Sequence, residues 1–194
     1  MLKKIVLLTS LVLALVVGAV AHPAAAASFV PSTDPWDEIQ TQATAISQQA
    51  ADIVSASQAI QAYAAQIQTN ESNPDVNAWA ADLIALASQT EQDAAAIMVT
   101  ADDINTRIDN SEGTTLALSD DIGEMADRIG EMADRILWTE LQIGVMADRI
   151  VESEYLISDS SLSLAQMIQS SSNTLATNGN AIAAEAATIN TLLP

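Results

Sequence analysis

The chain has no cysteine, a single histidine, few aromatic residues and few basic ones. Without cysteine it can form neither a disulfide scaffold nor a thiolate zinc site, and it has no thiol nucleophile. Its 194 residues carry 25 acidic side chains against 6 basic ones, for a net charge of −19. Charge of this sign opposes electrostatic binding to nucleic acid or to an anionic membrane surface, so we expect neither partner.

Residues 1–27 have the pattern of a secretory signal peptide. Lys3 and Lys4 precede the apolar run Ile5–Ala21, and an alanine cluster follows it, with cleavage expected before Ser28. An uncleaved anchor is the alternative, but the run is short for a membrane span and the small residues favour cleavage. We therefore expect an exported protein, periplasmic or extracellular, with no stable membrane span after cleavage.

Cleavage of this segment would leave little chemistry for catalysis. His22 and both lysines would leave with it, so four arginines and 25 acidic residues would give a net charge of −21. The commonest general base, a Ser-Lys dyad and histidine metal ligands would all be absent. Adjacent carboxylates such as Asp102 and Asp103 point about 100° apart on a helix and form no pocket. We expect no enzyme activity, no catalytic residue, no cofactor and no formed metal site.

The remaining acidic residues are expected to form a solvated surface. Asp82 and Asp93 lie among alanines and are predicted to be exposed. A surface of this charge attracts divalent cations loosely, without a coordination cage. The absence of lysine beside abundant aspartate also resembles proteins from high-salt environments, where screening reduces self-repulsion.

Two long runs of apolar residues at helical spacing follow the leader. Asp34 and Pro35 are placed as the cap and first residue of the first run, and the turn residues from Asn70 to Pro74 end it. Spacings of four and three residues put the apolar positions on one helix face. They are Ile39, Ala43, Ile46, Ala50, Ile53, Ser57, Ile60, Ala64 and Ile67, then Val76, Ala80, Leu83, Ala87, Thr90, Ala94, Ile97, Ala101, Ile104 and Ile108.

A third run has isoleucine every seven residues from Ile122 to Ile157, and its end allows two interpretations. Its seven-residue spacing continues through Ile157 to Leu164, which favours one long helix, whereas the polar stretch Ser158–Ser161 favours a turn. A turn leaves four segments of similar length that bury their faces against each other. We predict an all-α fold, an elongated antiparallel bundle or coiled coil of four helices at about 35–70, 75–110, 114–154 and 158–192. The alternative is three helices with a long third one.

These helices form a single predicted domain, residues 35–194, behind a short extended segment at 28–34. A possible further break lies at Asn178–Asn180, where two asparagines flank a glycine. The last run otherwise keeps the seven-residue spacing, through Ile168, Leu175, Ile182 and Ile189.

The third run contains a nearly verbatim seven-residue repeat. Units beginning at Ile122, Ile129 and Ile143 read Ile-Gly-Glu-Met-Ala-Asp-Arg, except that Val145 replaces the glutamate of the last, and the pattern lapses at 137–142. A strict heptad is typical of a left-handed coiled coil or bundle. The repeat resembles Met-Ala-Asp-Arg-Ile blocks in uncharacterised exported bacterial helical proteins. The resemblance covers residues 122–150 and implies helical architecture and export, but no activity.

The repeat also places charges and glycines in regular positions. Glu124 and Arg128, and likewise Glu131 and Arg135, are spaced to form ion pairs along the helix, and we interpret them as a solvated face with local support. Glycine in a helix interior costs about 1 kcal/mol relative to alanine. The glycines therefore indicate either close packing against another helix or recent duplication of the repeat; they are Gly123, Gly130 and Gly144.

The apolar face of the third run is the predicted site of helix–helix interaction. Trp138 marks its widest apolar patch, and we expect it to be a buried anchor, as are Trp36 and Trp79. An exposed Trp138 would instead suggest an assembly contact. The predicted interaction residues are Ile122, Met125, Ile129, Met132, Ile136, Trp138, Ile143, Met146 and Ile150.

From this pattern we expect an exported, non-enzymatic structural or interaction protein that associates with itself or with another helical protein. Two alternatives remain. Long amphipathic hairpins also occur in secreted membrane-active, pore-forming proteins. The composition, poor in aromatics and rich in Ala, Gln, Ser, Thr and Asn, is also similar to that of flagellins, which leaves a subunit of an extracellular filament as the other alternative.

Overall fold

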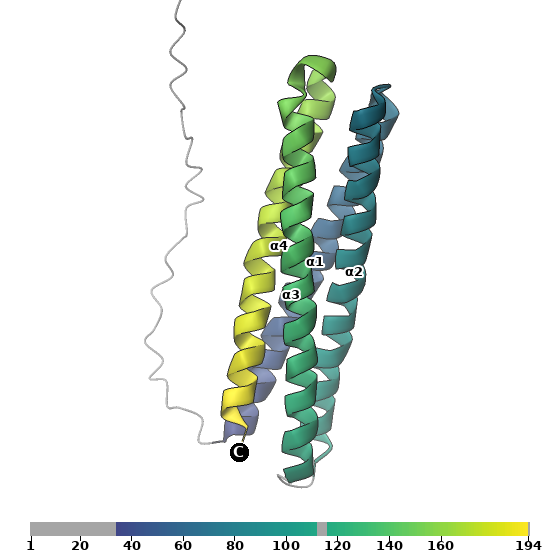
Figure 1. Cartoon of the computed structure of the whole chain (residues 1–194). Coiled ribbons are helices and arrows are strands. Elements are labelled where there is room, and N and C mark those ends of the chain that lie inside the picture. Colours follow the sequence, from purple (N-terminus) through teal and green to yellow (C-terminus); the bar gives the residue numbers. More distant parts are fainter. Residues whose placement is uncertain (1–33, 112–115, 194) are drawn as a thin grey trace, which may run out of the picture. The chain divides into compact units, whose positions relative to one another are not determined.

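A computed structural model describes residues 34–111 and 116–193 as four long helices joined by short connections. The helices are α1 (Pro35–Asn70), α2 (Pro74–Asp109), α3 (Leu116–Glu152) and α4 (Asp159–Leu192), with the short 3-10 helix η1 (Glu154–Leu156) before α4. Consecutive helices run in opposite directions (Figure 1). The predicted all-α fold of four antiparallel helices is confirmed, and the alternative with three helices is wrong.

The expected leader, its cleavage site before Ser28 and residues 28–33 of the expected extended segment lie outside the described residues. Asp34, at the end of that segment, has extended backbone angles of φ −104° and ψ 110°.

Three of the helices begin at a residue whose side-chain oxygen caps the backbone. Such a cap satisfies an N–H group that has no partner within the first helical turn. Proline follows the cap of α1 and of α2, where its missing N–H removes no hydrogen bond. The bonds run to Asp34 from the backbone N–H of Trp36, to Asn73 from those of Asp75 and Val76, and to Ser158 from that of Ser161.

The core is built in layers of isoleucine and alanine along the bundle. Each helix packs against two neighbours in the cyclic order α1, α2, α3, α4, so each also keeps an outer face. The buried isoleucines of α1 and α3 have no exposed surface, and at seven of the ten positions alanine or serine four residues later lets the backbones approach. They are Ile39, Ile46, Ile53, Ile60 and Ile67 on α1 and Ile122, Ile129, Ile136, Ile143 and Ile150 on α3.

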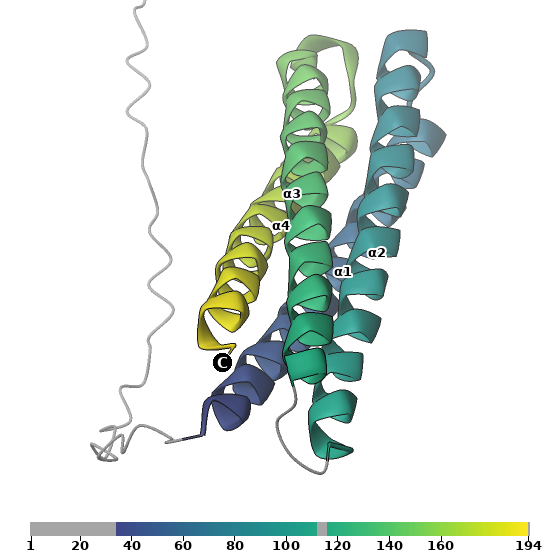
Figure 2. The same cartoon turned by 60° about the horizontal axis from the view of Figure 1, so that its bottom comes forward.

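The chain turns between α3 and α4 although the seven-residue spacing continues through this segment. The hydroxyl of Ser153 donates to the carbonyl of Arg149 at 2.9 Å, and Ser158 then caps α4. The backbone N–H and the hydroxyl of Ser158 also donate to Glu71, at 2.9 and 2.7 Å. Glu71 belongs to the connection between α1 and α2, so its carboxylate joins the two connections at the same end of the bundle (Figure 2).

Hydrogen bonds from the side chain of Ser161 and from the backbone of Ser158 lower the pKa of Glu71. The carboxylate form is therefore the one that holds the two connections together.

The possible break at Asn178–Asn180 is absent, because α4 continues through this segment. Gly179 is buried, and a β-carbon there would lie 3.0 Å from Cδ2 of Leu137 on α3. The glycine therefore provides space for a large side chain of the neighbouring helix and does not end its own helix.

Candidate functional site

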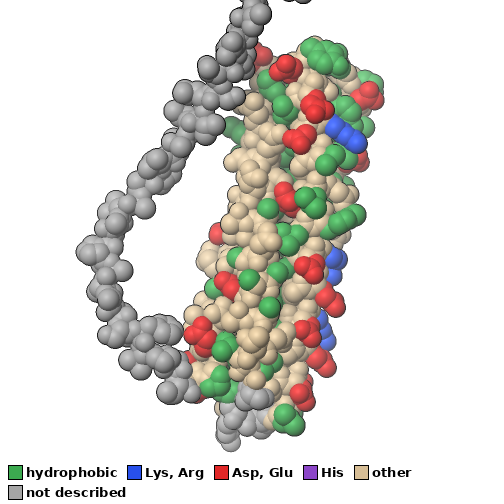
Figure 3. Space-filling view, turned by 60° about the vertical axis from the view of Figure 1, so that its left-hand side comes forward, with side chains coloured by type: hydrophobic (Ala, Val, Ile, Leu, Met, Phe, Trp, Pro, Cys, Tyr) green, Lys and Arg blue, Asp and Glu red, His purple; other side chains and the backbone are tan. Residues whose placement is uncertain are grey.

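Besides Leu116 at its start, α3 has three exposed large apolar side chains, which lie close together on its outer face. Trp138 and Leu141 each keep 65% of their surface accessible and Val145 keeps 48%. Their spacings of three and four residues place them along one line of the helix, which we call the α3 stripe. In Figure 3 hydrophobic side chains are visible on the same edge of the bundle as the arginines.

The other predicted interaction residues of α3 lie inside the bundle or against its core. The five isoleucines have no exposed surface, Met125 and Met132 are buried, and Met146 is half-buried against the core. Their contacts are therefore within the chain, where α3 packs against α2 and α4.

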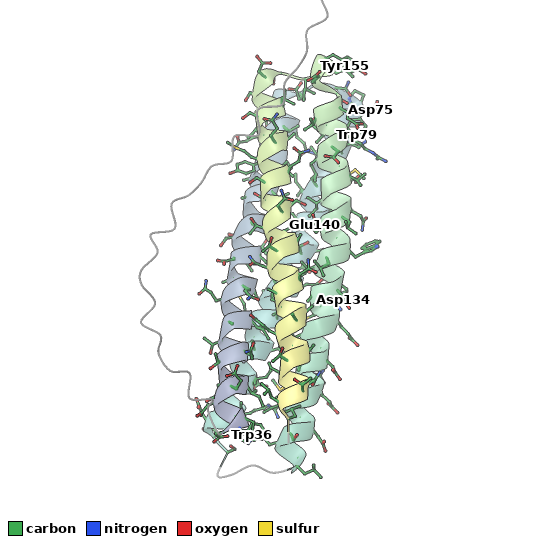
Figure 4. All side chains as sticks on the ribbon, turned by 90° about the vertical axis from the view of Figure 1, so that its left-hand side faces the viewer. Trp36, Asp75, Trp79, Asp134, Glu140 and Tyr155 are labelled. Carbon is green, nitrogen blue, oxygen red and sulfur yellow. The ribbon has the colours of Figure 1, made fainter. Side chains whose placement is uncertain are left out.

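Trp138 is exposed, so the prediction that it is a buried anchor was wrong. Trp36 is buried, as predicted, at the end of the bundle opposite Tyr155, whereas Trp79 is half-buried against the core (Figure 4). The repeat contained a signal for the exposure of Trp138. It occupies the same position in its unit as Glu124 and Glu131, both of which are exposed.

The α3 stripe replaces acidic residues of the repeat. The two preceding units carry a glutamate at the third position and an aspartate at the sixth, all exposed: Glu124, Asp127, Glu131 and Asp134. In the next unit these positions hold Trp138 and Leu141, and in the unit after it Val145 holds the third. The outer face of α3 thus changes from acidic to apolar over two turns and becomes acidic again at Asp148.

Asp93 is buried, which corrects the prediction that it lies on an exposed face. Its Oδ1 lies 2.7 Å from Nη2 of Arg135, which comes from α3 and is about half exposed. Arg135 thus pairs with Asp93 rather than with Glu131, the partner predicted from sequence. Asp93 lies seven residues after the half-buried Leu86, on the same line of α2 and next to the core. Its ion pair with Arg135 therefore joins α2 to α3.

The other arginines differ in their partners. Arg107 binds Asp103 at 3.1 Å and Asp121 at 2.7 Å, so two aspartates share this one arginine. Arg128 pairs with Glu124 at 3.9 Å, as predicted, and both side chains are exposed. Among the described residues Arg149 has no carboxylate within 4.0 Å, and its Nη1 instead lies 3.8 Å from Sδ of Met146.

Two open hollows lie between α3 and α4, each above a glycine of the repeat. Asp127, Glu131 and Asp134 surround Gly130, whereas Glu140 and Asp148 border the hollow at Gly144. A β-carbon at either glycine would meet no atom within 4 Å, so of the two interpretations of these glycines close packing against another helix does not hold at Gly130 and Gly144.

Gly123 differs, because its β-carbon would lie 3.3 Å from Cδ1 of Leu193.

Figure 4 places Asp134 and Glu140 in the middle part of the bundle. Across residues 34–111 and 116–193, no three acidic or histidine side chains are grouped so that they could hold a metal ion.

A half-buried carboxylate lies between α1 and α4. Nε2 of Gln49 donates to Oε1 of Glu185 at 2.9 Å, while Oε1 of Gln49 and Oε2 of Glu185 are buried without a hydrogen-bond partner. Burial raises the pKa of Glu185, and the hydrogen bond from Gln49 opposes this only in part.

No described helix has an apolar stretch long enough to cross a membrane. Comparisons with models of protein families, with curated proteins and with solved structures find no match to this chain. The outer face of α3 is apolar from Trp138 to Val145, with Asp134 before this segment and Arg149 after it.

Proposed function

We propose that the chain is an exported, non-enzymatic structural protein that associates with itself through the α3 stripe. The observation that carries the proposal is the exposure of Trp138 and Leu141 at repeat positions that are otherwise acidic. Large apolar side chains in a strongly acidic, solvated surface mark an interaction site. Tryptophan in particular is enriched among the residues that dominate binding energy.

The energetics favour a contact between two helices. Full burial of a large apolar side chain contributes about 1.5–3 kcal/mol, and a symmetric pair buries each residue of the α3 stripe twice. The opposing term is the repulsion between two strongly acidic chains, which salt at about 0.15 M screens beyond roughly 8 Å. We therefore expect a weak dimer that forms at high protein concentration.

The test of self-association is Trp138→Glu, which restores the residue type of the preceding repeat units. Burying that glutamate against an apolar partner is unfavourable, so we expect the dissociation constant to rise at least about tenfold. Sedimentation equilibrium over a concentration series measures it.

The matched control is Val99→Glu, because Val99 is 70% exposed on α2 and lies outside the α3 stripe. A wild-type protein that stays monomeric throughout the series contradicts self-association. Equal weakening by both variants contradicts the assignment to α3.

Export is supported by the positively charged start, the apolar run and the alanine cluster of residues 1–27. The expected result is a mature chain that begins at Ser28, which mass spectrometry of the protein recovered outside the cytoplasm measures. An intact N-terminus in a membrane fraction would instead support an uncleaved anchor.

A membrane-active protein is the second candidate, favoured by a different observation. Tyr155 and Leu156 lie exposed in η1, at the turn between α3 and α4. The neighbouring Glu152 and Glu154 oppose contact with anionic lipid. Leakage of dye from neutral phosphatidylcholine vesicles that Tyr155→Ser abolishes would support this candidate, and intact vesicles at every pH would remove it.

A further inference from the structure

The α3 stripe is flanked by residues of opposite charge on the same helix face. Asp134 precedes Trp138 by four residues, and Arg149 follows Val145 by four. Spacings of four, three, four and four residues from Asp134 to Arg149 keep all five side chains on one face. The helix therefore presents an acid, three apolar residues and a base in that order.

Neither charge at the ends of the α3 stripe has an ionic partner within the described part of the chain. The three other arginines each pair with a carboxylate, whereas Arg149 has only the sulfur of Met146 beside it. Asp134 is exposed above the hollow at Gly130, and no arginine of the described residues lies within 4.0 Å of it. Both are therefore available to a second molecule.

The arrangement is self-complementary about a single point. The midpoint between Trp138 and Val145 in the sequence falls between Leu141 and Gln142, and so does the midpoint between Asp134 and Arg149. In an antiparallel pair of identical helices, residues at equal distances on either side of the two-fold axis face each other. A single two-fold axis would thus bring Trp138 opposite Val145 of the partner subunit and Asp134 opposite Arg149 of the partner subunit.

We propose that a second copy of this chain covers the α3 stripe, with the two α3 helices antiparallel about a two-fold axis between Leu141 and Gln142. Trp138 then packs on Val145 of the partner subunit, and Asp134 forms an ion pair with Arg149 of the partner subunit at each end. This proposal rests on the self-association proposed above and specifies its direction and register.

A parallel pair in register is disfavoured by the same residues. It would set Asp134 against Asp134 of the partner subunit and Arg149 against Arg149 of the partner subunit. Like charges held together across an interface are destabilising, whereas complementary charges fix the register of a contact. The sequence of charges on α3 therefore selects the antiparallel arrangement.

Charge reversal on the full bundle tests the register. Asp134→Arg alone, or Arg149→Asp alone, replaces two attractive contacts in the antiparallel dimer by two repulsive ones. We expect each to raise the dissociation constant about tenfold, and the double variant to return it to near the wild-type value. Sedimentation equilibrium at about 0.15 M salt measures all four proteins, and circular dichroism verifies that each is folded.

A matched control reverses a charge on the same helix away from the α3 stripe. Arg128→Asp changes the net charge as much as Arg149→Asp does, and Arg128 is exposed. It should leave the dissociation constant within about twofold, because it lies beyond the central contact of two crossing helices.

A spin label gives a readout that does not depend on the ion pairs. The chain has no cysteine, so Glu131→Cys carries a single label on the outer face of α3. In the antiparallel register the two labels lie roughly 31 Å apart along the helix axes, at 1.5 Å per residue. In a parallel pair the same labels are separated only by roughly the 10 Å between helix axes.

The outcomes separate this proposal from the one it rests on. A dimer that single charge reversals leave unchanged, or whose labels are close together, overturns the antiparallel register and leaves self-association intact. A wild-type protein that is monomeric at every concentration overturns both. A monomer that binds phosphatidylcholine vesicles through Trp138 also overturns both proposals, because lipid then covers the α3 stripe.

Discussion

Two carboxylates with little access to solvent lie at different helix contacts and differ in how they are satisfied. Asp93 faces the guanidinium of Arg135 across the contact between α2 and α3. Glu185 faces only the amide of Gln49 across the contact between α1 and α4. Asp93 thus has a cation as its partner, whereas Glu185 has only a neutral amide, and burial raises the pKa of Glu185.

Removal of the cation beside Asp93 should destabilise the bundle more than removal of both partners. Arg135→Ala leaves a buried carboxylate unpaired, at a cost of about 1–2 kcal/mol at neutral pH, since the arginine is half exposed. The double variant with Asp93→Ala should cost less than Arg135→Ala alone. Urea denaturation measures each, with Arg128→Ala as the control, because its partner is exposed and the change should be near zero.

Equal losses for Arg135→Ala and Arg128→Ala would show that the burial of Asp93 is unimportant.

Glu185→Gln should stabilise the bundle at pH 7. The pKa of Glu185 is raised in the folded state, so the folded chain binds more protons than the unfolded chain between the two pKa values. Stability then falls as the pH rises through that window. The amide removes this loss and can donate to the unpartnered oxygen of Gln49, so we expect a gain of about 1 kcal/mol.

Thermal unfolding from pH 3 to pH 8 measures this effect. The difference from wild type should vanish at the acidic end, where Glu185 is protonated in both states. Asp82→Asn is the control for removal of one negative charge, because Asp82 is exposed. A gain of the same size in this control would assign the effect to net charge.

At the scale of the helix, the seven-residue spacing predicted the helices themselves, whereas the turn between α3 and α4 was predicted only from the polar stretch Ser158–Ser161 and the equal lengths of the segments. The predicted ends agree closely with those of α1, α2 and α4, because Asp34, Asn73 and Ser158 cap helices by local hydrogen bonds that their residue types favour. The exposure of Trp138 followed from the repeat but was not inferred. The burial of Asp93 could not be inferred, because its partner Arg135 lies on another helix.

Glycines of α3 and α4 have opposite roles in the helices. Gly144 of α3 has open space above it, so Gly144→Ala should stabilise the protein by about 0.5–1 kcal/mol through helix propensity. Gly179 of α4 lies against Leu137, and Gly179→Ala should destabilise it by about 1 kcal/mol or more through overpacking.

Chemical denaturation of both variants decides this, with a third protein as the internal check. In a Leu137→Ala background the contact at Gly179 is removed, so Gly179→Ala should become stabilising there. If Gly179→Ala is destabilising in both backgrounds, contact with Leu137 is not the cause.

At the scale of the whole molecule, the dominant feature is a surface of one sign. The sequence after residue 27 has 25 acidic residues and four arginines, and Figure 3 shows acidic groups along the length of the visible face. Charges of one sign that folding brings together repel each other and destabilise the compact state. Salt weakens this repulsion by screening.

We therefore expect the melting temperature to rise between about 10 mM and about 1 M sodium chloride, as the screening length falls from roughly 30 Å to 3 Å. Calcium chloride at matched ionic strength should stabilise by a similar amount if screening alone acts. A much larger effect of calcium, saturating at low concentration, would instead show a specific cation site. A melting temperature that falls with salt would contradict self-repulsion as the main electrostatic effect.

The repeated units of α3 also affect how the chain finds its fold. A shift of α3 along its neighbours by one unit would return isoleucine to isoleucine, and alanine to alanine except at Glu140, so misaligned helices would keep much of their apolar burial. The fit of Leu137 into the space at Gly179 and the bond from Arg135 to Asp93 each occur once, and a shifted helix would lose both. Unrepeated contacts such as these two thus contribute to the energy gap that separates the native alignment from shifted alignments of similar hydrophobic content.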